Sequence, residues 1–401
     1  MFYKLSKTFY ILFIFYTVWF QLFFHPIHNA PLMIGMGMIG CLLLHKMNAK
    51  KRLSFFVTKP VFIWLIFLFY IFITGYFVAF NKSLLITSAL TYFQTLIMMI
   101  YILDVAKNEG SSSFFVKSFA LLSIFYSITL LFWGYKMDGR VMLSPSSNAN
   151  SDGTVLQYGI FCLLVLMDLR KPYKFIISYA AIGMLLYAIV LTGSRKSFLF
   201  TVILILLWLC IILKYHWKFS SLKKKTLFLT LIAATLIVGV IEFVPVFFDS
   251  ALYIRLTEGL GYQGDQNRKE MYITALDYFK SNPLLGIGFN QFRVLSPWGT
   301  YSHSTYAEII STTGIIGPIL YFIPYLIIMY NIFLVYRYNK QTLIASQAIL
   351  YLVLMILMLF LATGVILFYD ITANIMFALM ISFYYISLRG MKVEFTTRTA
   401  V

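Results

Sequence analysis

Long apolar runs, separated by short polar interruptions, occupy most of the chain. A helix of about twenty apolar residues is long enough to cross the hydrocarbon core of a bilayer. The pattern therefore predicts an all-α integral membrane protein, a single polytopic domain over residues 1–401 with about twelve transmembrane helices. The first run is expected to be a retained span, because no small-residue cleavage site follows it. The predicted spans are 8–24, 29–44, 61–80, 84–106, 114–134, 154–169, 173–191, 197–214, 226–248, 312–336, 343–366 and 371–388.

The composition excludes a soluble enzyme and a disordered chain. Hydrophobic residues make up 61% of the sequence and charged residues 11%, with a mean hydropathy of +0.85. Such a chain lacks the polar residues that would keep a whole surface in water. Cys41, Cys162 and Cys210 all lie in apolar runs, where they are expected to be small buried hydrophobic residues and not a disulfide or a metal site.

The net charge of +18 would suggest nucleic-acid binding in a soluble protein. In a membrane protein it instead favours retention of basic residues on the cytoplasmic side. Placing both termini in the cytoplasm puts 22 of the 32 lysines and arginines inside, including the clusters Lys50–Arg52 and Lys223–Lys225. We therefore expect a multi-pass membrane protein with both termini in the cytoplasm and no nucleic-acid partner.

The basic residues left outside are unusually rich in arginine. Five of the ten arginines fall outside, against five of the 22 lysines. Sorting by positive charge alone does not explain this difference. Arginine offers a rigid, always-charged fork that suits phosphate or carboxylate groups. The bias indicates extracytoplasmic chemistry on an anionic group.

The longest polar interval forms a predicted extracytoplasmic loop, 249–311, which is expected to carry much of the active site. Apolar residues recur at helical spacing from Arg268 to Lys280 and predict a short amphipathic helix that Pro283 follows. Beyond it, Gly286-Ile287-Gly288 lacks the third glycine and the preceding strand of a nucleotide-binding loop. A tight turn is the expected structure there.

Three outer segments contain candidate functional residues. His303 could act as a general base near neutral pH, or could be an ordinary interfacial histidine. Arg195, in a short turn between two spans, could line a hydrated site or only anchor at the interface. Asn148 and Asn150, downstream of Arg140, could bind hydroxyl-rich ligands or simply form a turn. No second His or Cys stands at zinc-ligand spacing, so we expect no metal.

These motifs, in their order along the chain, resemble the O-antigen ligase and polymerase superfamily. The resemblance is carried by the Gly193-Ser194-Arg195 turn, by Arg268, and by the segment from Pro283 to Gly288. It continues through His303-Ser304-Thr305-Tyr306 and Gly314-Ile315-Ile316-Gly317. Arg140 with Asn148-Ala149-Asn150 is similar to the family's Arg…Asn-Pro-Asn stretch, with Ala149 in place of proline.

The resemblance implies an inverting, metal-independent glycosyltransferase with no cofactor, acting on the outer face of the bacterial cytoplasmic (inner) membrane. Its donor would be an oligosaccharide on undecaprenyl diphosphate. His303 would be the catalytic base, and Arg195, Arg268 and Arg140 would bind the diphosphate. Asn150 and the carboxylates would contact the acceptor or orient the base; the candidate carboxylates are Glu258, Asp265, Glu270 and Glu308.

Three functions remain open from the sequence. A polysaccharide polymerase would join lipid-linked repeat units into a capsular, exopolysaccharide or O-antigen-like glycan, with a chain-length regulator or flippase as a partner. A ligase would move finished glycan to another acceptor. A transporter or flippase of lipid-linked oligosaccharide would place ionisable groups near the middle of the membrane. The nearly charge-free spans and the outer cluster of charge favour an enzyme.

Overall fold

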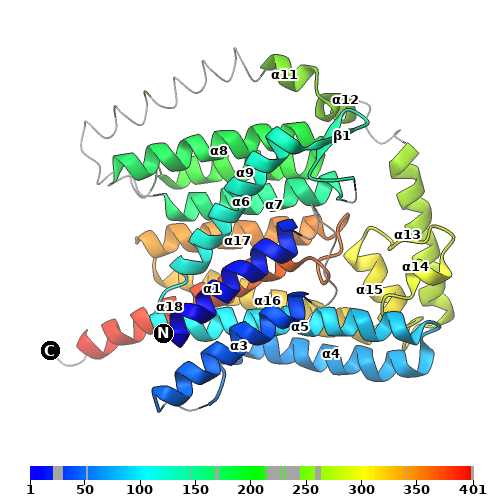
Figure 1. The fold of residues 1–401 in the computed structure, drawn as a ribbon, viewed down its shortest axis with the longest axis horizontal. Coiled ribbons are helices and arrows are strands. Elements are labelled where there is room, and N and C mark those ends of the chain that lie inside the picture. Colours follow the sequence, from blue (N-terminus) through cyan, green and yellow to red (C-terminus); the bar gives the residue numbers. More distant parts are fainter. Residues whose placement is uncertain are drawn as a thin grey trace.

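The computed structural model describes residues 1–20, 30–50, 53–145, 147–167, 171–212, 244–257, 263–340 and 342–398, with the single residues 214, 226 and 230. In this part the chain is mostly helical, which confirms the predicted all-α membrane architecture (Figure 1). The longer helices are α1 (Phe2–Phe15), α3 (Ala30–Asn48), α4 (Lys59–Val78), α5 (Lys82–Glu109), α6 (Ser113–Trp133), α7 (Ala149–Leu166), α8 (Pro172–Thr192), α9 (Arg195–Ile211), α13 (Gln263–Ser281), α16 (Ile316–Tyr338), α17 (Leu343–Leu361) and α18 (Ile371–Arg398). The shorter elements are η1 (Tyr16–Phe20), α11 (Val244–Phe248), α12 (Ala251–Thr257), α14 (Phe292–Leu295), α15 (Thr305–Thr313), β1 (Tyr135–Met137) and β2 (Arg140–Met142).

Eight helices within the described residues are long and apolar enough to cross a membrane: α3, α4, α5, α6, α8, α16, α17 and α18. Helices α1, α7 and α9 coincide with three further predicted spans but are shorter or less apolar. The ninth predicted span, 226–248, lies largely outside the described residues. The total of twelve spans therefore stays a prediction.

Two helices form the centre of the bundle. On α18, every residue from Ile375 to Ile381 is fully buried, and α7 is buried almost all round from Asp152 to Leu164. An apolar helix that is buried on every side must be surrounded by other helices. Accordingly, α7 packs against α6, α8 and α9, while α18 packs against α5 and α16.

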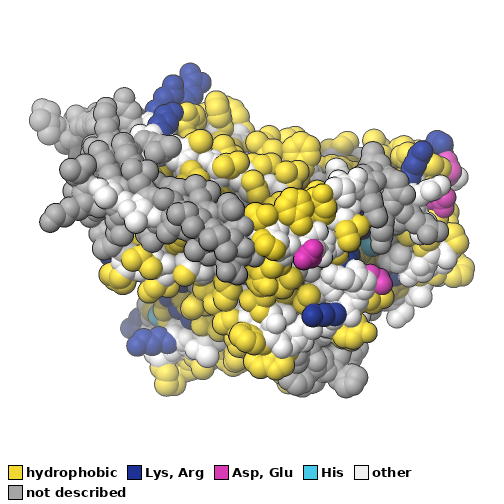
Figure 2. Space-filling view, turned by 90° about the horizontal axis from the view of Figure 1, so that it is seen from above, with side chains coloured by type: hydrophobic (Ala, Val, Ile, Leu, Met, Phe, Trp, Pro, Cys, Tyr) yellow, Lys and Arg dark blue, Asp and Glu magenta, His cyan; other side chains and the backbone are white. Residues whose placement is uncertain are grey.

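The outer helices bury only one side. On α4, the stripe Trp64, Phe67 and Ile71 is fully buried at helical spacing, whereas Phe69 and Phe77 are exposed. Exposed apolar side chains are what a lipid-facing surface requires. Hydrophobic side chains likewise dominate the middle of the molecular face seen in Figure 2.

A short β-hairpin interrupts the otherwise helical fold and was not predicted. Strands β1 and β2 pair antiparallel around Asp138-Gly139, whose φ angles are both positive, at 51° and 71°. An Asp-Gly pair favours such a two-residue turn, because its central residues need positive φ. The hairpin brings Arg140 to the end of the bundle where β1, α12, α13, α14 and α15 lie together, at the right of Figure 1.

Candidate active site

Four basic side chains line one cavity at this end of the bundle. Arg195 and Lys196 come from the start of α9, Arg255 from α12 and Arg268 from α13. None of the described lining residues is acidic. The cavity holds about 40 Å³, which is room for roughly three water-sized groups. It can admit phosphate oxygens, while a sugar would have to lie outside it.

Reciprocal hydrogen bonds fix the two arginines nearest the α8–α9 turn. Gly193 ends α8 with a φ of 64°, a conformation that favours glycine. The Arg195 Nη1 atom donates to the backbone oxygen of Arg255 at 3.0 Å, and Arg255 Nη1 donates to the oxygen of Gly193 at 2.6 Å. These contacts hold α12 against the turn and keep both guanidinium groups at the cavity.

Arg140 binds the same turn from the other side. Its Nε atom donates to the backbone oxygen of Thr192 at 2.8 Å, and its Nη2 atom donates to Asn150 Oδ1 at 3.0 Å. Arg140 does not line the cavity, whereas Asn150 does. In this arrangement Arg140 satisfies a carbonyl at the end of α8 and orients Asn150.

His303 lies close enough to Arg268 to be affected by its charge. Burial, and then the positive charge of Arg268, lower the pKa of His303 from 6.5 to about 4. The imidazole is therefore neutral at pH 7 and can accept a proton. Its ring centroid lies 4.6 Å from that of Tyr301. The backbone of His303 has a φ of 58°, in the left-handed region.

Glu308 holds the loop that presents His303. Its side chain is fully buried, and Oε2 accepts a 2.7 Å hydrogen bond from the backbone N–H of Ser302. Burial raises the pKa of Glu308 to about 7. Ser304 then begins α15, and its side chain accepts from the N–H of Ala307. The two contacts flank His303 and restrict the loop on both sides.

The connection between α17 and α18 joins the separate parts of the site. Thr305 donates through Oγ1 to the oxygen of Val365 at 2.6 Å and accepts from the N–H of Leu367 at 2.9 Å. Two residues earlier, Thr363 accepts from Lys196 through its hydroxyl and from Tyr272 through its backbone oxygen. One short segment thus contacts the histidine loop, the start of α9 and α13.

A comparison with known protein families bears on this geometry. Residues 180–322, about a third of the chain, match the family model described as O-antigen ligase. This segment is similar to the O-antigen ligase family. The match confirms the resemblance seen in the sequence, and members of the family are glycosyltransferase-like enzymes. No curated protein matches the chain.

The matched segment contains Arg195, Arg268 and His303, while Arg140 and Asn150 precede it. The structure brings the two segment arginines into one cavity. His303 is not among the described residues that line this cavity, but it lies within range of the charge of Arg268. Glu258 lies outside the described residues, and so does the side chain of Asp265. The part of the chain that is described contains no cluster of three potential metal ligands.

The glycine-bearing turn of the segment serves packing. A Cβ atom on Gly286 would lie 2.4 Å from the backbone of Thr312, and one on Gly314 would lie 2.2 Å from the oxygen of Leu284. The two turns pack backbone to backbone, joined by hydrogen bonds such as Ile287 N–H to Ser311 oxygen at 2.9 Å. This is the tight turn that the sequence predicts.

Two cavity residues, Lys196 and Arg255, were not singled out from the sequence. Each lies in a segment predicted to be extracytoplasmic, where a basic residue is also expected as an interfacial anchor. The sequence pointed to such residues only through the high proportion of arginine in the segments predicted to be extracytoplasmic. The sequence did not indicate that the connection at 362–370 belongs to the site, because its first residues continue the apolar run of the span predicted at 343–366.

We expect Thr305→Val to destabilise the site, since this isosteric change removes the hydroxyl that binds both Val365 and Leu367. Two buried backbone groups would lose a partner, at a cost of roughly 2–4 kcal/mol. Thermal unfolding of the purified protein measures the effect. Thr305→Ser keeps the hydroxyl and serves as the matched control. Equal unfolding temperatures for the two variants would contradict this role.

Proposed function

We propose that this chain is an extracytoplasmic, inverting and metal-independent glycosyltransferase. It joins repeat units carried on undecaprenyl diphosphate into a capsular, exopolysaccharide or O-antigen-like polysaccharide. The observation that carries the proposal is the convergence of four basic side chains on one cavity, with a neutral histidine within range of the charge of Arg268. The family match supports glycosyl transfer, and the cluster of cations supports a phosphate-bearing donor.

The donor's diphosphate binds at the cationic cavity. A diphosphate leaves with both electrons of the glycosidic bond and needs no proton, but its growing negative charge must be stabilised. Arg195 and Arg268 supply bidentate hydrogen bonds to it. Lys196 and Arg255 add further positive charge at the same cavity. Fixed side-chain cations thereby provide the charge that a leaving diphosphate requires.

The acceptor hydroxyl is activated by His303. Its imidazole takes the hydroxyl proton as the acceptor oxygen attacks the anomeric carbon from the face opposite the diphosphate, which inverts the linkage. Arg268 connects the two events. In the free protein its charge lowers the pKa of His303. A bound diphosphate offsets that charge, so the pKa rises and the base strengthens when the donor is in place.

The proposed orientation follows from the basic residues. Both termini are cytoplasmic, and the cavity opens at the outer face of the inner membrane. The outer placement suits a donor that has already crossed the membrane. A flippase is then required upstream, and a chain-length regulator is a natural partner for a polymerase.

The test is the glycan length in cells that lack this gene, complemented with wild type or with an inactive variant. A polymerase predicts that single lipid-linked repeat units accumulate, and that the wild-type gene restores long chains. Long unattached chains on undecaprenyl diphosphate would instead establish the ligase function. Repeat units trapped on the cytoplasmic side would establish a flippase.

A further inference from the structure

A much larger cavity lies at the opposite end of the bundle from the candidate active site. It holds about 640 Å³, within the range of small-molecule and lipid sites. Its walls come from the inner ends of α6, α7, α8, α9, α17 and α18. The reaction proposed above uses none of these residues.

The polar side of this cavity is positively charged. Lys117, Lys171 and Lys174 line it, and all three side chains are exposed. None of the described lining residues is acidic. Helices α8 and α17 begin here, and neither has a side-chain cap on its first N–H groups. Uncapped helix starts and lysines both favour an anion.

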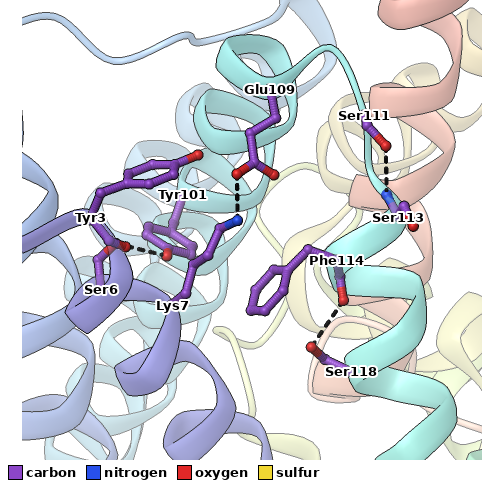
Figure 3. A network of polar contacts seen from close by, with 9 residues as sticks. All are labelled: Tyr3, Ser6, Lys7, Tyr101, Glu109, Ser111, Ser113, Phe114 and Ser118. Carbon is purple, nitrogen blue, oxygen red and sulfur yellow. Dashed lines mark hydrogen bonds and ion pairs between the residues drawn. The ribbon is translucent and has the colours of Figure 1, made fainter. Parts of the chain in front are cut away.

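Two other lysines, Lys7 and Lys46, are paired with carboxylates. Lys46 pairs with Asp104 at 2.8 Å. Lys7 pairs with Glu109 and lies 4.6 Å above the Phe114 ring, as Figure 3 shows at the α5–α6 turn. That turn continues into the cavity wall through Ser111–Ser113. The three cavity lysines form a positively charged cluster, and the described lining residues include no carboxylate.

The remaining wall is apolar and faces the membrane interior. This wall includes Trp208 and Ile211 of α9, Ile212 directly after it, and Phe383 and Ile386 of α18. One end of the cavity thus suits a phosphate and the other suits hydrocarbon. A soluble anion would use only the first of these surfaces, whereas a phospholipid uses both.

We propose that this cavity binds an anionic phospholipid of the inner leaflet. The phosphate of the headgroup lies among the three lysines and the starts of α8 and α17, and the acyl chains lie along α9 and α18. The chemistry of the site is independent of the proposed glycosyl transfer; only the choice of leaflet uses the proposed orientation. Basic pockets between transmembrane helices are suited to such headgroups.

The experiment measures thermal unfolding of the full-length protein in detergent. The added probes are dioleoyl-phosphatidylglycerol, dioleoyl-phosphatidylcholine and inorganic phosphate. We expect phosphatidylglycerol to raise the unfolding temperature well above the value in phosphatidylcholine, and phosphate alone to have little effect. Each lysine near an anionic headgroup contributes about a factor of five. The triple variant Lys117→Gln, Lys171→Gln, Lys174→Gln should therefore bind phosphatidylglycerol about a hundredfold more weakly.

A matched control carries the same change in charge at exposed lysines outside the cavity: Lys4→Gln, Lys50→Gln and Lys59→Gln. It should respond to phosphatidylglycerol like wild type. If both triple variants lost the same amount of stabilisation by phosphatidylglycerol, the effect would depend on net charge alone, and the proposed site would be wrong. Equal stabilisation by both lipids would contradict a preference for an anionic headgroup. Full stabilisation by inorganic phosphate would contradict lipid binding. None of these outcomes depends on glycosyltransferase activity.

Discussion

Replacing His303 with alanine is expected to abolish polysaccharide formation while leaving expression and membrane insertion intact. A general base in the transition state accelerates proton transfer by about 10²–10⁴-fold, so its removal should lower the rate by that factor. The assay is the glycan ladder of the complemented deletion strain. Transfer by purified protein in liposomes, with lipid-linked units extracted from the deletion strain, gives the rate itself.

The backbone of His303 makes asparagine a better control than alanine alone. At a φ of 58°, alanine carries a steric penalty of roughly 1–2 kcal/mol, whereas asparagine tolerates the left-handed region. His303→Asn therefore keeps the loop conformation and a polar side chain but removes the base. Both variants should lose activity, and His303→Asn should do so without losing the thermal stability of the wild type. A near-normal rate in His303→Asn would exclude His303 as the base.

The pH profile separates His303 from Glu308. With the pKa of free His303 at about 4, kcat/KM should remain level as the pH falls through 6.5 and decline only near 4, when the imidazole becomes protonated. The pKa of Glu308 is about 7. A decline near pH 7 that disappears in Glu308→Gln would instead assign the base to the glutamate.

The local pattern of the sequence was sufficient to predict most of the helices but not their exact ends. Long apolar runs specify membrane helices because the bilayer demands satisfied backbone groups over its whole thickness. The span predicted as 343–366 illustrates the limit. Helix α17 ends at Leu361, and the apolar residues after it form the connection that contacts Thr305 and Lys196. Hydropathy cannot distinguish a helical apolar residue from a buried turn.

The sequence predicted those site residues whose position has few structural explanations. An arginine at the start of an outer turn is costly in the membrane unless it serves a hydrated cavity, and Arg195 does line one. Arg140 shows why the prediction was incomplete. Its contacts with Thr192 and Asn150 depend on a hairpin turn that brings distant segments together. Such contacts arise from tertiary packing, and no local pattern contains them.

Replacing Arg268 with lysine is expected to lower the transfer rate about a hundredfold, even though the positive charge is retained. A lysine is a point charge and cannot reproduce the two parallel hydrogen bonds of a guanidinium fork to a diphosphate. Losing one such electrostatic contact in a transition state costs on the order of 3 kcal/mol. The measurement is the transfer rate in liposomes. A rate within a few fold of wild type would indicate that Arg268 only anchors α13.

Arg268→Gln tests the link between this arginine and the base. Because the charge of Arg268 lowers the pKa of His303, its removal should raise that pKa toward 6.5, by less than the full shift since burial remains the larger cause. The imidazole pKa can be followed by NMR of labelled protein. Arg268→Lys, which keeps the charge, should leave the histidine pKa low while losing activity. The pair of variants thus separates the two roles of Arg268: its fork binds the donor, and its charge keeps His303 a weak base until the diphosphate offsets it.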